Sequence, residues 1–539
     1  MKSVLHSFAF GGFGLLGLAL AATPPSGDTV EHISQRQQNG SEGCIPACTE
    51  LAQTFPDQVL TKDTPAYSNF TNGAYWAQQQ QQTSPQCVFK PSNADQVAAL
   101  VDIVRRTHCP FAIRSGGHGA FAGVSSIVDG ITVSLEKLSA IDVSPDNRTV
   151  SVGVGNTWLT VYQALEKHGL AVPGGRYPTV GVGGLSLGGG VSFFANTRGW
   201  TCDNIRSYEV VLANATVVQV DNTSSSLSDL HWALRGGGNN FAIVTKVNMD
   251  AFPLPDGGRM WGGFHVVNAS EQASTIINAA YNLGTTGADT DPGVAQIVNF
   301  GVFPGLPGKI GIAILSHAAG QNQQQPNPPA AMSEFLAIPA LADTTRLRTL
   351  SNLSAELGNG GGLGGGDSST PKRRARGTAT FALNVDIMTA AKDICFDEMD
   401  QLVAAGVSGL EATCVFQVIS SGQLAASTQR GGNALGVGPE DGPLFLLNVV
   451  LGWANAVDDN RVHRAARNIA ERSTEYGDAR GWARDFRYMN YAGEFQDVLA
   501  SYGAAEKARL VATAKKYDPE GVFQTLLPGA FKLGGAPVS

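Results

Sequence analysis

Glycine is the residue that most constrains how this chain can fold. It accounts for 65 of the 539 residues, and three dense clusters lie at residues 114–119, 174–190 and 236–238. Glycine loses more conformational freedom on folding than any other residue, so a dense cluster is a poor choice for core packing. Such clusters are useful where the backbone must lie against a flat or phosphate-bearing ligand. The pattern therefore predicts a protein that holds a ligand against its main chain.

The first cluster reads Arg-Ser-Gly-Gly-His-Gly and directly follows a strand-like run at residues 110–113. Its backbone N–H groups can turn toward an anion, as pyrophosphate-binding loops require. His118 would then lie beside the reactive part of the ligand. The alternative for this hexapeptide alone is a structural turn with a bystander histidine.

Two further segments point the same way. Residues 174–190 hold a dense glycine run, but they lack the Gly-Lys-Ser/Thr of a Walker loop and the strand–helix context of a nicotinamide dinucleotide turn. Residues 232–245 place a triple-glycine turn before a β-run. Near the C-terminus, Tyr488 and Tyr491 are three residues apart; they are either core aromatics or, beside a redox cofactor, a source of a phenolic general base.

Composition and charge exclude several classes. A net charge of -8 argues against nucleic-acid binding. A composition of 43% hydrophobic and 15% charged residues is typical of a globular protein. A chain of this length predicts two or more domains. Cys44 and Cys48 have no second His/Cys pair near them, so we expect no metal site.

The N-terminus has the features of a secretory signal at residues 1–21, with an apolar run too short to span a membrane. We expect residues 22–43 to be a mobile arm and the protein to be secreted. Two sets of residues fit that route, since cysteines pair in oxidising compartments and sequons carry glycans. The sequons are Asn39, Asn69, Asn147, Asn214, Asn222, Asn268 and Asn352, and the cysteines are Cys44, Cys48, Cys87, Cys109, Cys202, Cys395 and Cys414. Their odd number leaves at least one free thiol, and the pairing stays open.

The order of strand-like and helical runs predicts two domains. We expect an N-terminal arm at residues 22–80, with glutamines 78–82 in a solvated turn. The first domain follows at residues 81–253. It holds short β-runs, glycine turns and two helices, at 92–107 with Ser92 as N-cap and at 157–168. Longer alternating runs at 261–267, 295–303, 309–316, 379–386, 411–419 and 444–453 predict an antiparallel sheet covered by helices within residues 254–480. Residues 354–377 read as a flexible loop, with a dibasic processing site or a lid as the sharper alternatives. Residues 481–539 return to the first domain.

The three glycine-bearing motifs and Tyr-Met-Asn-Tyr at 488–491, in this order, resemble the FAD-linked oxidases of the vanillyl-alcohol oxidase and berberine-bridge-enzyme superfamily. The resemblance runs from about residue 87 to residue 531. It implies an α+β fold made of a two-part PCMH-type FAD-binding domain and a substrate domain. It also implies a covalent bond from His118 to the flavin, a flavin contact from Asn490 and proton removal by Tyr491, although some relatives use a base from the substrate sheet. Further cofactor-binding residues implied are Arg114, Ser115, Gly116, Gly117, Gly119, Gly183, Gly184, Gly188, Gly238 and Ile243.

One departure from the family pattern is informative. Members with a doubly attached flavin carry a cysteine where this chain has Tyr177, so we expect a single covalent link through His118. Leu185 likewise replaces a histidine found in one variant of the second motif. Tyr177 favours a smaller or more enclosed substrate than the bulky sugars that doubly attached enzymes often take.

The sequence thus predicts a secreted FAD-dependent oxidase that transfers a hydride from a small alcohol, phenolic or secondary metabolite to the flavin, with O2 as the acceptor and hydrogen peroxide as a product. The alternatives are an oligosaccharide oxidase and a flavoprotein cyclase without net redox change. The expected partners are a small-molecule substrate and O2, with no nucleic acid and no membrane, and the oligomeric state stays open.

Overall fold

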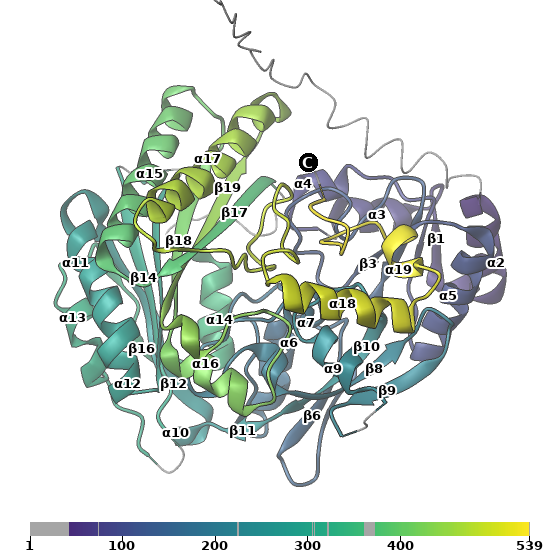
Figure 1. The fold of residues 1–539 in the computed structure, drawn as a ribbon, viewed down its shortest axis with the longest axis horizontal. Helices are drawn as coiled ribbons and strands as arrows, with labels where there is room; N and C mark the ends of the chain where they lie inside the picture. The colour runs from purple at the N-terminus through teal and green to yellow at the C-terminus, as the bar shows by residue number, and fades with distance from the viewer. Residues whose placement is uncertain are drawn as a thin grey trace, which may run out of the picture.

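A computed structural model describes residues 43–537 apart from 74, 224–225, 304, 307, 321–322 and 361–371. The predicted signal segment and the predicted arm up to residue 42 therefore lie outside the described residues. Two bodies lie side by side in Figure 1, one built on two small sheets and the other on one large sheet with helices on its outer face. This is the α+β architecture that the sequence predicts.

The first small sheet carries the histidine loop. It has the strand order β1 (Val59–Thr61), β2 (Cys87–Phe89), β4 (Ile131–Ser134), β3 (Phe111–Arg114), and the two pairings with β4 are parallel. Helix α5 (Ala94–Thr107) connects β2 to β3. Its N-cap is Asn93, whose side chain accepts a hydrogen bond from the Gln96 N–H, and not Ser92 as predicted. The helix turns its apolar positions inward and ends at His108 (φ 53°), which delivers the chain into β3.

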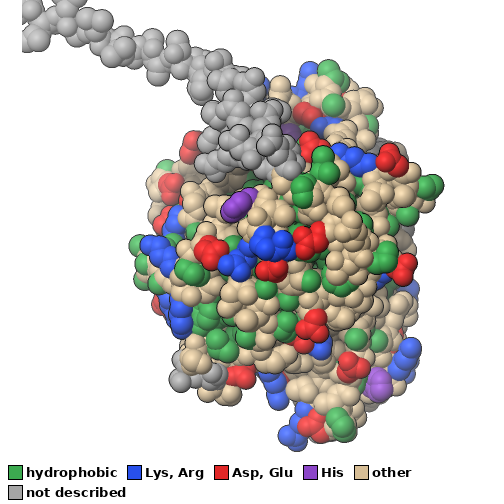
Figure 2. Space-filling model, turned by 90° about the vertical axis from the view of Figure 1, so that its right-hand side faces the viewer, with side chains coloured by type: hydrophobic (Ala, Val, Ile, Leu, Met, Phe, Trp, Pro, Cys, Tyr) green, Lys and Arg blue, Asp and Glu red, His purple; other side chains and the backbone are tan. Residues whose placement is uncertain are grey.

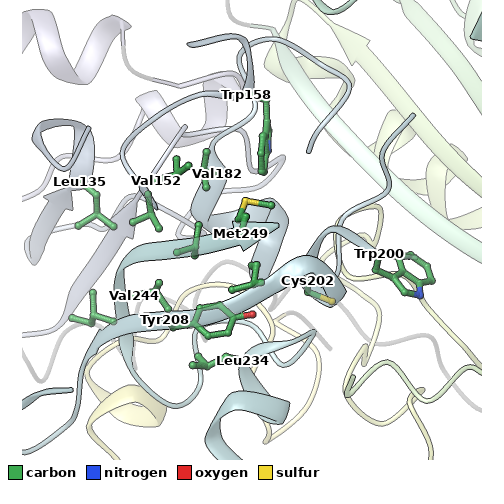
Figure 3. Packing of buried hydrophobic residues seen from close by; sticks show 14 of the residues in the cluster. Leu135, Val152, Trp158, Val182, Trp200, Cys202, Tyr208, Leu234, Val244 and Met249 are labelled. Carbon is green, nitrogen blue, oxygen red and sulfur yellow. The ribbon is translucent and has the colours of Figure 1, made fainter. Parts of the chain in front are cut away.

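The second small sheet is antiparallel, in the order β5 (Ile141–Val143), β6 (Thr149–Gly153), β10 (Ile243–Asp250), β8 (Ile205–Val211), β9 (Val217–Asp221). Alternate side chains of β6, β8 and β10 point into one apolar layer, which Figure 3 shows around Val152, Tyr208 and Met249. Neighbouring elements of this domain are α6 (Trp158–Glu166), β7 (Leu170–Ala171), α7 (Val182–Leu187), α8 (Ala195–Arg198), α9 (Ser228–Leu234), β11 (Phe252–Pro253), α18 (Ala504–Tyr517) and α19 (Val522–Thr525).

The large sheet is antiparallel and has nine strands. Their order is β15 (Ala342–Asp343), β12 (Arg259–Asn268), β14 (Ile310–His317), β13 (Val294–Val302), β18 (Glu411–Ile419), β19 (Leu444–Trp453), β17 (Arg373–Ala382), β20 (Ala483–Arg484), with β16 (Arg346–Thr349) also paired to β12. Helices α11 (Ala269–Asn282), α15 (Val385–Ala404) and α17 (Asp459–Asp478) lie against the face turned away from the first domain (Figure 1). The remaining helices are α10 (Pro255–Gly258), α12 (Ala288–Thr290), α13 (Ser333–Leu336), α14 (Leu350–Gly358) and α16 (Ser421–Gln429).

Strand alternation divides the side chains of this sheet between two cores. In β19, Phe445, Leu447 and Val449 pack with the covering helices, whereas Leu444 and Leu446 belong to the core shared with the first domain. The inner face therefore closes against the first domain.

Two predictions for this domain are wrong in detail. The strand expected at 379–386 begins at Arg373 and ends at Ala382, because Asn384 caps helix α15. The expected loop at 354–377 starts inside α14 and ends inside β17, and its middle, residues 361–371, lies outside the described residues. Arg373 is buried and ion-paired with Asp459, so the basic run is part of a sheet and not an accessible dibasic site.

The described part of the N-terminal region is folded. It forms α2 (Cys44–Thr54), β1, α3 (Pro65–Gly73) and α4 (Gln78–Gln81). Disulfides Cys44–Cys109 and Cys48–Cys87 tie α2 to the first domain, and Cys395–Cys414 joins α15 to β18. Cys202 is the free, buried cysteine. The glutamine tract is a helix and not a solvated turn, since Gln80 is fully buried and bonds Gly119 and Ser125.

The surface over the first domain mixes charges. Figure 2 shows acidic and basic side chains interspersed on that face, without an extended region of one sign. Along the described ranges, no helix is long and apolar enough to cross a membrane. The same ranges hold no group of three His, Cys, Asp or Glu residues placed to bind a metal ion.

Candidate active site

The first two glycine clusters contact each other backbone to backbone. Ser115 Oγ donates to the Val154 carbonyl (2.6 Å) and accepts from the Gly183 N–H (3.2 Å). A Cβ on Gly116 would lie 2.3 Å from the Gly181 nitrogen. Gly117 has a φ of 66°, which favours glycine, and its carbonyl accepts from the Trp76 N–H. The absence of side chains is therefore what lets the two loops meet.

His118 lies next to this contact of the two loops, and its ring is placed between two aromatic side chains. Its imidazole stacks on Trp76 (centroids 4.6 Å apart, planes 14° apart) and meets Tyr177 edge-on at 5.3 Å. Burial, together with the guanidinium groups of Arg376 and Arg374, lowers the pKa of His118 to about 3. The imidazole is therefore neutral at physiological pH. Its Nε2 is shielded from solvent and has no hydrogen-bond partner among the described residues.

The second cluster meets the C-terminal motif. Asn490 Nδ2 donates to the Leu185 carbonyl (3.0 Å) and to Tyr488 Oη (3.0 Å). A Cβ on Gly188 would lie 2.3 Å from Asn490 Oδ1, so this glycine leaves room for the amide. By contrast, a Cβ on Gly184 would meet nothing within 4 Å. The loop thus borders open space at Gly184.

Tyr491 is held by Arg176, a residue near the start of the second cluster. Arg176 Nη2 donates to Tyr491 Oη (2.7 Å), and Arg176 Nη1 donates to Gln417 of β18. The Tyr488 ring packs edge-on against Tyr491 at 4.8 Å. Burial raises the pKa of Tyr488, whose hydroxyl accepts from the Gly190 N–H, so Tyr488 is a structural neighbour.

Other predicted residues lie around this centre in supporting positions. The Gly119 carbonyl accepts from Gln80, the Gly238 N–H donates to the Leu187 carbonyl with a φ of 69° at Gly238, and Ile243 is a buried residue at the start of β10. The Arg114 side chain points elsewhere. Its Nη1 lies 3.1 Å from Ser134 Oγ and 3.3 Å from Glu136, and its guanidinium faces two aromatic rings.

Trp76, Arg374 and Arg376 complete the site, and the sequence reasoning missed all three. Arg374 and Arg376 of β17 place their guanidinium carbons 4.4 and 4.9 Å from the centre of the Trp76 ring. Arg376 Nη1 donates to the Asn490 carbonyl (2.6 Å), and burial lowers the pKa of Arg376 to about 10. The spacing of two between these arginines is a strand signal that the sequence already contained.

The residues present fit a flavin adenine dinucleotide. The glycine loops offer main chain free of side chains, open space borders Gly184, and a neutral imidazole with an unpartnered nitrogen stands beside them. A separate cavity of about 1190 Å³, lined by residues such as Phe194, Phe252 and His317, includes none of the predicted site residues. The loop arrangement, and not that cavity, is the candidate active site.

Fold and site together define an FAD-dependent oxidoreductase. The family described as "FAD binding domain" matches residues 85–221. FAD-dependent monooxygenase tpcD of Cochliobolus heterostrophus is 34% identical over 510 residues, which cover 91% of this chain and 94% of that protein. The chain belongs to the FAD-linked oxidoreductases of the vanillyl-alcohol oxidase and berberine-bridge-enzyme family.

Solved structures agree on the fold. 6-Hydroxy-D-nicotine oxidase of Arthrobacter nicotinovorans matches with a TM-score of 0.68 and 20% identity, over 86% of this chain and 96% of that one. Glucooligosaccharide oxidase of Acremonium strictum, described with a 6-S-cysteinyl, 8α-N1-histidyl FAD, matches with a TM-score of 0.70 and 17% identity, over 92% and 99%.

Proposed function

We propose that this chain is a secreted oxidase of small alcohols, phenols or related metabolites that carries FAD on a single covalent link to His118. One observation carries the proposal: a neutral imidazole with an unpartnered nitrogen stands at the end of a glycine cradle. Tyr177 packs against that ring at the position where doubly attached relatives have cysteine. The chain therefore offers one nucleophile to the flavin and not two.

The flavin, when bound, supplies the redox chemistry, accepting a hydride from a substrate carbon and returning two electrons to O2 as hydrogen peroxide. The chain's own residues position the substrate and handle its proton. A phenol accepts a proton only in its ionised form, so Tyr491 acts as the phenolate whose Oη takes the proton of the substrate hydroxyl and becomes the phenol, while the hydrogen bond from Arg176 fixes its orientation. Trp76 and Tyr177 enclose His118 and keep water from it.

Secretion is supported by the disulfide bonds and by the exposure of the sequons. Three disulfides are typical of oxidising compartments. Among the sequons within the described residues, Asn69, Asn147, Asn214, Asn222 and Asn352 are exposed, as glycan attachment requires.

The covalent link is tested by precipitating the purified protein with acid. We expect the pellet to stay yellow and a proteolytic peptide containing His118 to carry the mass of FAD. Free flavin in the supernatant would contradict the link. A second modified peptide containing Tyr177 or Cys202 would contradict the single attachment.

The reaction class is tested by adding candidate substrates without oxygen. An oxidase substrate bleaches the flavin. When O2 is readmitted, one hydrogen peroxide should form for each reduced flavin. Sugars compared with aromatic and aliphatic alcohols distinguish an oligosaccharide oxidase from the proposed enzyme. Incorporation of label from ¹⁸O2 into the product would instead indicate a monooxygenase, and a product formed without bleaching would indicate a cyclase.

A further inference from the structure

The substrate-facing side of the large sheet carries more positive than negative charge. Lys372 and Arg374 both lie against Glu411, the latter at 3.6 Å. Arg376 donates to a main-chain carbonyl, and Arg176 donates to an amide and a phenol. Within the described part of the chain, neither Arg176 nor Arg376 forms an ion pair with a carboxylate. Two guanidinium groups thus remain without a counter-charge.

For Arg376, whose pKa burial lowers, the lack of a counter-charge is unfavourable, whereas Arg176 is half-buried. A buried charge is normally paired, because removal from water costs several kcal/mol per ion. Burial shifts the pKa of Arg376 downward to about 10, which reports that penalty, yet the group stays charged at neutral pH. The Nε atoms of Arg374 and Arg376 are also buried and without partners among the described residues. These unused N–H groups are donors aimed at no protein acceptor.

The neighbouring positions on the same sheet face are polar acceptors. Asn299 of β13 and Asn448 of β19 flank Val415 of β18 in one row across the strands. The next row along the sheet holds Arg376, paired with Val450. Both asparagine Oδ1 atoms are buried without a partner in the described structure. They can accept hydrogen bonds from a hydroxyl group that lies beside the arginines.

We propose that the substrate carries an oxyanion, either a carboxylate or an ionised phenol or enol, and that Arg376 and Arg176 bind it beside Tyr491. This inference rests on the proposed function, since it names the substrate class of that same site. Guanidinium groups favour planar oxyanions because their N–H donors match the geometry of two oxygens. The oxyanion would supply the charge that the resting protein lacks.

The test measures the binding of matched charged and neutral probes to the flavin-loaded enzyme by calorimetry. 4-Hydroxybenzoate against 4-hydroxybenzamide probes a carboxylate, and 4-nitrophenolate against 4-nitroanisole probes an ionised phenol. We expect the charged member of at least one pair to bind about tenfold more tightly, as one charge-assisted hydrogen bond allows. Which pair discriminates identifies the source of the oxyanion. Equal binding within both pairs, or no binding by any probe, would overturn the inference.

Variants locate the effect. Arg376→Gln should reduce the preference for the charged probe about tenfold and leave the neutral probe unchanged, and Arg376→Lys should restore part of it. Arg464→Gln, an exposed arginine on α17, is the matched control and should change neither probe. A preference that survives both Arg376→Gln and Arg176→Gln would overturn the assignment. Should these variants not fold, the probe pairs on the unsubstituted enzyme still decide.

Failure of this inference is distinguishable from failure of the proposed function. A flavin-loaded enzyme that oxidises neutral alcohols and shows no charge preference would contradict only the oxyanion. A protein without flavin that still prefers 4-hydroxybenzoate would support the oxyanion and contradict the oxidase.

Discussion

The two walls of the candidate active site are built in opposite ways. The first-domain wall is defined by missing side chains, because Gly116 and Gly181 let two main-chain segments touch. The second-domain wall is defined by long side chains, since Arg374 and Arg376 reach out from β17 to Trp76. The first arrangement suits a cofactor shared by many enzymes, and the second suits a particular substrate. Substitutions on the two walls should therefore fail in different ways.

The largest effect is expected on the cofactor wall, at His118. His118→Ala removes the proposed attachment point while leaving the glycine loops intact, so acid precipitation should release all of the flavin into the supernatant. Absorbance of pellet and supernatant measures this. Arg376→Gln is the matched comparison from the other wall and should keep its pellet yellow. Acid-stable flavin in His118→Ala would show that another residue forms the link.

The next effect tests Tyr491, which stands between the two walls. Tyr491→Phe removes the proposed proton acceptor and should lower kcat by about 10²–10⁴-fold, the usual contribution of a positioned general base. Flavin content should stay unchanged, because the hydroxyl bonds Arg176 and not the cradle. Single-turnover reduction of the flavin is the measurement. An unchanged rate would move the role of base to the substrate sheet.

Two glycines of the cofactor wall should respond in contrasting ways. Gly116→Ala forces a Cβ to within 2.3 Å of the Gly181 nitrogen, and overpacking of this kind destabilises by about 1–3 kcal/mol. Gly184→Ala meets nothing within 4 Å and should leave the thermal midpoint of the flavin-free protein unchanged or raised. If the cofactor uses that space, Gly184→Ala should still lower flavin retention. Equal stability of both variants would contradict the close contact of the loops.

The smallest effect is expected where the N-terminal segment supports the arginine wall. The Gln79 amide nitrogen donates to the Arg374 carbonyl (2.8 Å), and its amide oxygen accepts from the Arg374 N–H (3.0 Å). Gln79→Ala should reduce the free energy of unfolding by about 2 kcal/mol, at roughly 1 kcal/mol per hydrogen bond. Gln81→Ala, which loses one bond to the Asn72 carbonyl, is the control and should lose less. Denaturant titration compares the two.

The contrast between the walls also explains what sequence could predict. His118, Ser115 and Gly183 lie in short motifs whose order along the chain is distinctive, and the structure brings them together. Trp76 and Arg376 have no motif of their own, since their roles depend on a sheet pairing and a side-chain stack between distant segments. The prediction of a solvated turn at the glutamine tract is wrong for the same reason: the tertiary bonds of Gln80 outweigh a composition that is typical of such turns.

The contacts of residues 76–79 with β17 have a consequence for anyone who recombines relatives of this enzyme. A chimaera that takes residues 254–480 from another member keeps Gln79, whose two bonds go to the main chain at position 374 and do not depend on the side chain there. The same exchange replaces Arg374 and Arg376, so Trp76 keeps its cation–π contacts only where the other member has cations at both positions. The segment around Trp76 and helix α4 should therefore travel with the large sheet, although the chain order places it with the cofactor domain. Inherited substrate preference in such hybrids would follow this short segment as well as the sheet.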